Sequence, residues 1–309
     1  MMNRMRCRHC SEAAAVHMRQ HKLALCEAHF VEWVQKQTRR SIEKYRMFVP
    51  EDRLLVAVSG GKDSLALWHI LLTLGYKADG LYIDLGIDDE TGYSDRSRGC
   101  IEDFLQAFRP DAALHSLNLK AVYGESLPEV ARRNRRGRDK PCSTCGLIKR
   151  HEMNRLADEL GCDALVTGHN LDDEVAVLWG NTLHWQTEYL ARQAPVLPAD
   201  RAGLVRKVKP LCRLYERETA AYALVSGIRY IYEECPFSAG ATSLYYKGVF
   251  NEMERHRPGT KLKFYLSFLK AKKNGLFSPG RVQELSLCCR CGQSTLSNGL
   301  CSFCKLWER

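Results

Sequence analysis

Residues 59–64, SGGKDS, have the side-chain types and spacing needed to hold a phosphate group. They follow the apolar run RLLVAV and precede the helical pattern LALWHILLTLG, so we expect them to join a strand to a helix. Gly60 and Gly61 allow a tight turn whose N–H groups face an anion, and the helix N-terminus adds a favourable partial charge. Lys62 can reach a phosphate, and Asp63 can hold Mg²⁺ through water. The spacing differs from the Walker A pattern; the alternative is an ordinary Gly-rich turn. The predicted phosphate-binding residues are Ser59, Gly60, Gly61, Lys62, Asp63 and Ser64.

A second motif, TGHNLDDE over residues 167–174, follows another short apolar run. Gly168 permits close approach of the backbone to a nucleotide. Asp172 and Asp173 fall in the first turn of the next predicted helix, where carboxylates are favoured. They could be simple helix caps, but beside SGGKDS we expect a role near phosphate and magnesium.

Three cysteines outside the two ends of the chain could bind a metal or a cluster. Cys142 and Cys145 form a CxxC pair, and Cys235 lies far away in the segment ECPF. A CxxC pair is also typical of redox sites and of half of a zinc site. Three thiols are too few for a closed Cys₄ zinc site; they suit a [4Fe–4S] cluster with one open iron, although such clusters more often have four cysteines. The spacing alone does not decide between these alternatives.

Both ends of the chain predict small structural zinc sites, because each carries two closely spaced ligand pairs. The N-terminal set is Cys₃His and the C-terminal set is Cys₄. The predicted ligands are Cys7, Cys10, Cys26 and His29 at the first site, and Cys288, Cys291, Cys301 and Cys304 at the second.

These motifs must be positioned by a core that alternates strands and helices, which predicts an α/β fold with a parallel sheet and helices on both faces. Ligands of such sheets bind at the carboxyl ends of the strands, where both polar motifs fall. We predict an N-terminal zinc finger over residues 1–29, a linker helix over 30–50, a catalytic domain over 51–275 and a C-terminal zinc finger over 276–309.

The formal net charge of +10 favours a polyanionic partner such as nucleic acid. The run RRNRRGRDK before Cys142 is interpreted as a basic loop that contacts tRNA phosphate, with a merely solvated loop as the alternative. Its predicted contact residues are Arg132, Arg133, Arg135, Arg136 and Arg138. No apolar stretch is long enough to span a bilayer and no secretory pattern is visible, so we expect no membrane partner and a cytoplasmic location. Fourteen cysteines in that reducing compartment are expected to serve as metal ligands or catalytic thiols.

Taken together, SGGKDS, PCSTCG, TGHNLDDE, ECPFSAGAT and the two cysteine modules resemble the TtuA-type tRNA 2-thiouridine synthetases over essentially the whole chain. SGGKDS by itself resembles the pyrophosphate loop (PP-loop) of the N-type ATP pyrophosphatases, a superfamily that includes the related TtcA thiolases. TtcA-like proteins resemble the middle of the chain and lack this pair of zinc modules. The resemblance implies a PP-loop domain, of the adenine nucleotide alpha hydrolase-like kind, flanked by two zinc fingers.

The resemblance also implies a reaction. ATP adenylates the C2 oxygen of a uridine, and sulfur delivered through a [4Fe–4S] cluster on the three cysteines replaces that oxygen. By motif position, Lys149 and Asp173 resemble further functional residues. The implied cofactors are ATP, Mg²⁺, the cluster and two Zn²⁺, and the implied partners are tRNA, a ubiquitin-like thiocarboxylate carrier or other sulfide donor, and a second copy of the chain.

Two other function classes stay open from the residues. One is a different adenylating tRNA enzyme, such as a cytidine thiolase or a lysidine-type ligase, and the other is a non-catalytic zinc-finger nucleic-acid binder. The cysteine triad argues against a lysidine-type ligase, which needs no cluster, and an intact SGGKDS argues against the binder. The motifs do not distinguish between uridines of the T-loop and of the wobble position.

Overall fold

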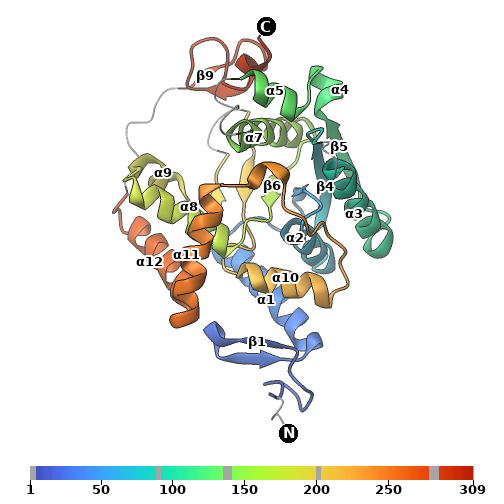
Figure 1. Cartoon of the computed structure of the whole chain (residues 1–309), viewed down its shortest axis with the longest axis vertical. Helices are drawn as coiled ribbons and strands as arrows, with labels where there is room; N and C mark the ends of the chain where they lie inside the picture. Colours follow the sequence, from blue (N-terminus) through green and yellow to red (C-terminus); the bar gives the residue numbers. More distant parts are fainter. Residues whose placement is uncertain (1–4, 88–91, 135–140, 200–202, 278–284, 309) are drawn as a thin grey trace.

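The computed structural model describes residues 5–87, 92–134, 141–199, 203–277 and 285–308. Its centre is a six-stranded sheet with strand order β5-β4-β3-β6-β8-β7, in which β7 alone runs antiparallel, to β8 (Figure 1). The predicted α/β class is therefore confirmed. The strands are β3 (Arg53–Val58), β4 (Lys77–Asp84), β5 (Leu114–Asn118), β6 (Ala164–Thr167), β7 (Val196–Leu197) and β8 (Arg206–Val208).

Both faces of the sheet are covered at its centre, which explains why β3 and β6 are apolar at nearly every position. Leu54, Val56 and Val58 of β3 enter one hydrophobic cluster, and Leu55, on the opposite face, enters the other. The first face is covered by helices α2, α3, α8, α10 and α12, and the second by α4, α5 and α7. These helices are α2 (Lys62–Thr73), α3 (Tyr93–Phe108), α4 (Leu119–Tyr123), α5 (Leu127–Arg133), α7 (Pro141–Glu159), α8 (Leu171–Leu183), α10 (Glu216–Val225) and α12 (Thr260–Lys273).

The remaining helices connect the layers. They are α9 (Thr187–Arg192), the 3₁₀ turn η2 (Pro236–Ser238) and α11 (Thr242–His256). Pro258 and Gly259 separate α11 from α12, and Gly259 has the left-handed φ of 97° that favours glycine. In the described part of the chain, no helix is long and apolar enough to cross a membrane.

The two cysteine modules lie at opposite ends of the molecule, with the two termini (Figure 1). The first contains β1 (Val16–Met18), η1 (Arg19–His21) and β2 (Leu23–Leu25), and the second β9 (Ser286–Leu287), β10 (Ser294–Thr295) and η3 (Cys304–Trp307). Helix α1 (Glu27–Tyr45) starts earlier than the predicted linker helix, so His29 lies inside it. Its residues Phe30, Val34 and Ile42 are buried in the main core, so α1 is an integral layer of the fold. Our division into four segments stays a proposal.

Candidate active site and metal sites

The predicted phosphate-binding segment forms the turn between β3 and α2. Gly60 has φ 74°, and a side-chain Cβ at this position would lie 2.5 Å from the backbone oxygen of Ser97. The turn is braced by Ser64, whose Oγ accepts from the backbone N–H of Ser59 at 3.1 Å and donates to the Gly61 carbonyl at 3.0 Å. Gly61 caps α2, so the unsatisfied N–H groups of the first helical turn open beside Lys62 and Asp63.

The second motif packs directly against this turn, because β6 pairs with β3. A Cβ on Gly168 would lie 3.0 Å from the backbone of Asp63 and Ser64, so only glycine fits there without displacement. Asn170 donates from Nδ2 to Asp63 Oδ1 at 3.1 Å, and the hydroxyl of Thr219 donates to the same oxygen. Burial is the main cause that raises the pKa of Asp63. The two predicted motifs therefore meet at one site.

Asp172 and Asp173 have different surroundings. Asp173 forms a capping box with Asn170 at the start of α8, and it also pairs with Lys247 at 2.6 Å. Its expected role near phosphate and magnesium stays a prediction. Asp172 is buried and accepts from Lys261, also buried, and from the backbone N–H of Glu216 at 3.0 Å. Its carboxylate thus joins α8 to α10 and α12.

Charged residues that the motif analysis missed complete this site. Glu216, the first residue of α10, bridges two lysines: Lys62 at 2.7 Å and Lys247 of α11 at 3.1 Å. Burial opposes the charge of Lys62, but the carboxylates of Asp63 and Glu216 outweigh it and raise the pKa of Lys62. Neither Glu216 nor Lys247 lies in a recognisable motif, and each is a lone charged residue in a helical pattern, so the sequence carries no signal for them.

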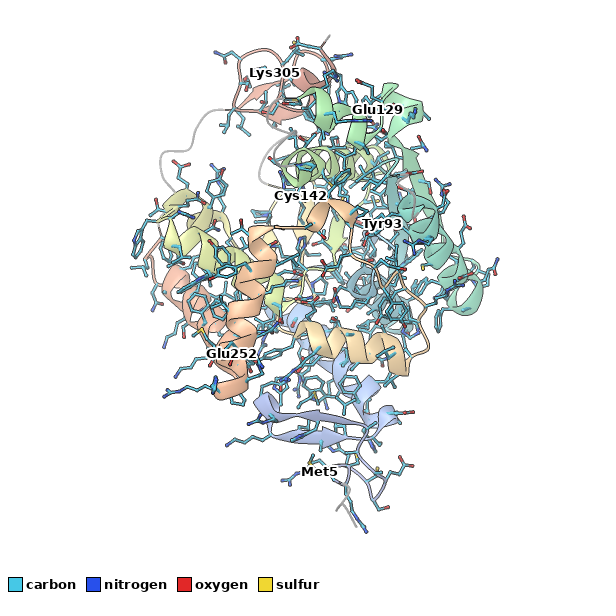
Figure 2. The ribbon with its side chains drawn as sticks, in the orientation of Figure 1. Met5, Tyr93, Glu129, Cys142, Glu252 and Lys305 are labelled. Atoms are coloured by element: carbon cyan, nitrogen blue, oxygen red, sulfur yellow. The ribbon has the colours of Figure 1, made fainter. Side chains whose placement is uncertain are left out.

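The predicted cysteine triad converges where α7 meets η2. Pro141 opens α7, so Cys142 and Cys145 lie in its first turns, and Cys235 caps η2. Cys142 is exposed and donates from Sγ to the Phe237 carbonyl at 3.0 Å; Figure 2 shows it at the end of α7, beside the segment that contains η2. Burial, followed by the charges of Cys145 and Cys235, raises the pKa of the Cys142 thiol, and Lys149 opposes that rise.

This triad fits a ligand larger than one metal ion. In the described residues, two sets of metal-ligating groups have all their ligand atoms within 4.8 Å of one another, and both are terminal modules; the triad is not among them. Burial, and then the neighbouring thiols Cys145 and Cys235, raise the pKa of Cys142, so positive charge between the three sulfurs would favour their ionised form. A cluster of several iron atoms provides both the size and the charge.

A cavity of about 120 Å³ lies between two thiols of the triad and Ser59, the first residue of the phosphate loop. Polar groups from both sites line it: Ser59, Lys149, Cys145 and Cys235. Leu81, Ile83 and Leu85 supply its apolar walls, and Tyr93 closes it beside the sulfurs. Lys149 is half-buried, which differs from an ordinary surface lysine.

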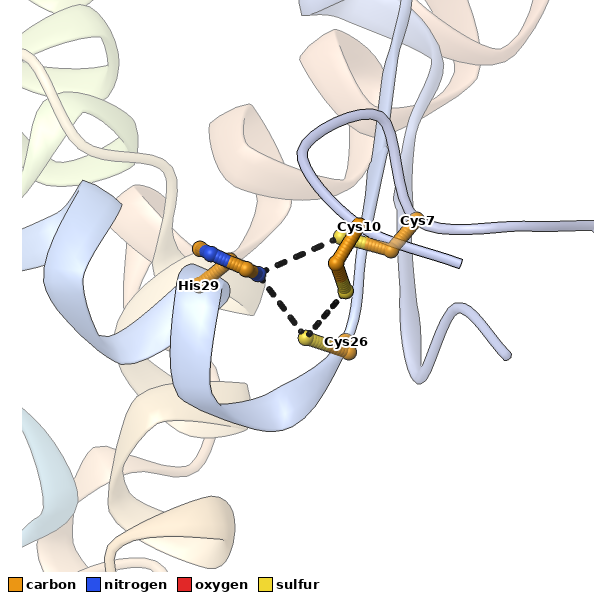
Figure 3. A group of neighbouring side chains, drawn as sticks. All are labelled: Cys7, Cys10, Cys26 and His29. Atoms are coloured by element: carbon orange, nitrogen blue, oxygen red, sulfur yellow. Dashed lines mark hydrogen bonds between the residues drawn. The ribbon is translucent and has the colours of Figure 1, made fainter. Parts of the chain in front are cut away.

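The N-terminal set forms a compact group of four ligands, with Cys7 and Cys26 buried (Figure 3). His29 Nδ1 lies 3.5 Å from Cys7 Sγ and 3.2 Å from Cys26 Sγ, and the sulfurs of Cys10 and Cys26 are 3.7 Å apart. Burial opposes ionisation of Cys7, but backbone N–H groups, including that of His9, lower the pKa of its thiol to about 6. Three sulfurs and one ring nitrogen at these distances suit a tetrahedral zinc ion.

The C-terminal set is equally compact and docks on α7. Its ligands Cys288, Cys291, Cys301 and Cys304 lie within 4.8 Å of one another. Burial opposes ionisation of Cys288, but backbone N–H groups, that of Cys301 among them, lower its pKa to about 6. His151 of α7 places Nε2 3.4 Å from Cys291 Sγ, stacks on Phe303 at 3.6 Å and pairs through Nδ1 with the fully buried Glu152 at 2.7 Å.

The predicted tRNA-contacting arginines are described only in part. Arg135, Arg136 and Arg138 lie outside the described residues. Arg132 and Arg133 end α5, where Arg132 is exposed. Arg133 pairs with Glu125 at 2.7 Å and donates to the Leu306 carbonyl of the C-terminal module at 2.8 Å. Arg133 is thus engaged in holding that module.

Comparison with known proteins gives one consistent assignment. A family model described as the N-terminal LIM domain of 2-thiouridine synthetase TtuA matches residues 6–31. The fold also matches a solved structure described as the U34-tRNA thiolase NcsA from Methanococcus maripaludis with its [4Fe–4S] cluster, with a TM-score of 0.78, 22% identity, and coverage of 99% of this chain and 96% of that one.

Curated relatives match at higher identity. A protein named tRNA-5-methyluridine(54) 2-sulfurtransferase from Thermus thermophilus is 47% identical, covering 98% of this chain and 91% of the relative. Proteins of the same name from Pyrococcus horikoshii and Thermotoga maritima are 44% and 41% identical, each covering 98% of this chain and 94% or 96% of the relative. With this identity over nearly its whole length, the chain belongs to the family of TtuA-type tRNA 2-sulfurtransferases.

Proposed function

We propose that this protein uses ATP to replace the C2 oxygen of 5-methyluridine at position 54 of tRNA with sulfur. The observation that carries the proposal is that one cavity is lined both by Ser59 of the phosphate loop and by the thiols of Cys145 and Cys235. The position is supported by the printed names of the three relatives at 41–47% identity.

In this proposal the uridine oxygen attacks the α-phosphate of ATP, pyrophosphate leaves, and a sulfur nucleophile then displaces AMP together with that oxygen. The first step, adenylation of the uridine oxygen, uses groups of the protein itself. N–H groups at the start of α2 and the Lys62 amine bind phosphate oxygens, and Asp63 holds Mg²⁺ through water. The apolar walls around Leu81 and Ile83 exclude water, which would otherwise hydrolyse the activated base.

The second half takes place at the triad. Cys142, Cys145 and Cys235 would hold a [4Fe–4S] cluster, which when bound supplies an iron position that can carry sulfide. Lys149 lines the same cavity and places a cation where negative charge gathers on phosphate or sulfur. The two terminal sets would each bind one structural Zn²⁺. A thiocarboxylate carrier as sulfur donor and a homodimeric assembly stay predictions.

The first test concerns the loop. We expect Lys62→Ala and Asp63→Ala to lower the rate of AMP formation and of tRNA thiolation by about 10²–10³, because each removes one electrostatic contact with the reacting phosphates. Lys120→Ala, at an exposed lysine of α4, serves as the control. Near-normal turnover of either loop variant at saturating ATP would contradict the assignment, and AMP formation without thionucleoside in the tRNA would favour another adenylating enzyme.

The second test concerns the triad. Serine variants of Cys142, Cys145 and Cys235 should each lose bound iron and activity after anaerobic purification. The matched variants Cys100→Ser and Cys212→Ser change thiols that are buried in the main core, and they should keep both. A persulfide relay between Cys142 and Cys235 is the competing mechanism. It would be favoured if iron-stripped protein thiolated tRNA as fast as reconstituted protein from the same sulfur donor.

A further inference from the structure

Lys247 of α11 is the second amine at the phosphate loop. Only 17% of its side chain is exposed, and its Nζ lies 2.6 Å from Asp173 Oδ1 and 3.1 Å from Glu216 Oε2. The other oxygen of Glu216 lies 2.7 Å from Lys62 Nζ. One carboxylate therefore bridges two ammonium groups, one from the predicted motif and one from a helix far along the chain.

The ends and the packing of three helices hold this arrangement in the absence of nucleotide. Glu216 starts α10, where a carboxylate is favoured by the helix N-terminus, and Asp173 caps α8. Helix α11 packs closely on α8 at Gly180, where a Cβ would lie 3.1 Å from the ring of Tyr246, the residue before Lys247. The amine of Lys247 is thus held by three helices.

Both lysines are charged in this arrangement. Burial opposes the charge of Lys247, but Asp173 and Glu216 outweigh it and raise its pKa above the ordinary lysine value. Burial also opposes ionisation of Glu216, but Lys247 and Lys62 hold the pKa of that carboxyl below its usual range. A carboxylate between two ammonium groups presents two acceptor oxygens at the separation of the amines, as a phosphate group can.

We propose that Lys247 is a second phosphate-binding lysine for ATP, and that the Glu216 carboxylate holds both amines in place until phosphate oxygens displace it. This inference rests on the proposed use of ATP at the loop. The alternative is that Lys247 only ties α11 to α8 and α10 as a structural ion pair.

A second ion pair, Lys209 with Glu174, serves as the control that distinguishes phosphate binding by Lys247 from a purely structural role. Lys209 pairs with Glu174 at 2.6 Å with 18% of its side chain exposed, and its amine makes no contact with Lys62, Asp63 or Glu216 among the interactions found in the described residues. Lys247→Gln and Lys209→Gln should therefore both lower stability, because each removes a largely buried ion pair. Binding of a non-hydrolysable ATP analogue, of inorganic pyrophosphate and of AMP would be measured by calorimetry on metal-loaded full-length protein.

We expect Lys247→Gln to weaken the analogue and pyrophosphate by about 10- to 100-fold, the value of one charged hydrogen bond, and to leave AMP binding within a few-fold. Lys247→Arg should restore most of the affinity, and Glu216→Gln should tighten pyrophosphate binding, because the competing carboxylate is gone. Equal affinity in Lys247→Gln and the wild type, or equal losses in Lys247→Gln and Lys209→Gln, would overturn the proposal. If the wild type binds no nucleotide, the proposed function itself fails; if Lys62→Gln loses affinity and Lys247→Gln does not, only the role of Lys247 fails.

Discussion

Replacing Gly60 by alanine should both destabilise the protein and weaken nucleotide binding. The residue has φ 74°, which costs an L-residue about 1–2 kcal/mol. The new methyl group would lie 2.5 Å from the Ser97 carbonyl oxygen, well inside the roughly 3.3 Å at which carbon and oxygen normally make contact. Such overpacking typically costs about 1–3 kcal/mol, so we expect a total loss of about 2–5 kcal/mol.

The turn cannot relax without further losses. The Gly60 carbonyl accepts from the Ile231 backbone N–H at 2.9 Å, so a shift away from Ser97 disturbs a second contact. The N–H groups that are proposed to face phosphate would turn with it. We therefore expect the affinity for the ATP analogue to fall by at least the tenfold that corresponds to one lost hydrogen bond of about 1.4 kcal/mol.

Gly99→Ala is the matched control. Gly99 lies in α3, two residues after Ser97, and a Cβ there would meet no atom within 4 Å. Alanine in a helix is favoured over glycine by about 0.8–1.0 kcal/mol, so this variant should be slightly more stable than the wild type. The two substitutions would be compared by urea denaturation and by calorimetric titration with the analogue. Wild-type stability and affinity in Gly60→Ala would refute this account of the loop.

Three further outcomes are expected. Cys26→Ser and Cys301→Ser should each release about one zinc ion per chain and lower stability, because metal binding and folding of such modules are coupled; elemental analysis that finds no zinc lost from either variant would contradict this. Arg132→Ala should weaken binding to all tRNAs alike and flatten its salt dependence, whereas Arg133→Ala should mainly lower stability, since its guanidinium holds Glu125 and Leu306; equal effects on the salt slope would argue against this division. His151→Ala should cost about 2–4 kcal/mol in urea denaturation, from the lost stacking on Phe303 and a lost partner of the buried Glu152; an unchanged midpoint would show that this docking contributes little.

The local motifs of the sequence predict much of this site because their chemistry is encoded within a few residues. Gly60 and Gly168 are examples: the sequence predicts a tight turn at the first and close backbone approach at the second, and the structure shows clashes for a Cβ at each. At Gly168, however, the nearest neighbour is the backbone of Asp63 and Ser64, a part of the protein itself. The sequence indicates that glycine is needed and does not indicate what approaches it.

The sequence contains start signals for two of the helices that position the cysteines. Pro141 at the first helical position is a strong start signal, and Cys142 and Cys145 lie in the first turns of the helix that follows it. Similarly, Glu27 in the first turn marks the start of α1 just after Cys26.

Long-range pairs are different, because no local pattern contains them. Glu216 is 154 residues from Lys62, and the partner of Cys291 on the enzyme core is His151, 140 residues away. These contacts depend on how the helices pack on the sheet, which is a property of the whole fold. They are also the contacts that give the site its charge balance and the C-terminal module its place.

Helix α7 explains why a small cysteine module is needed at that place. Successive helical residues are about 100° apart, so Cys142, Cys145 and Lys149 share one face, and His151 points about 180° away from Cys142. Cys145 and Lys149 of the first face line the cavity, and the opposite face stacks His151 on Phe303 of the C-terminal module. A helix that presents thiols to a cavity cannot bury that face in a conventional core. Its rigidity must come from the other side. There the Cys₄ module packs on the helix, and Tyr123 donates to the buried Glu152 of α7. Loss of that module would therefore disturb the positions of the Cys142 and Cys145 thiols, although the module packs on the opposite face of the helix.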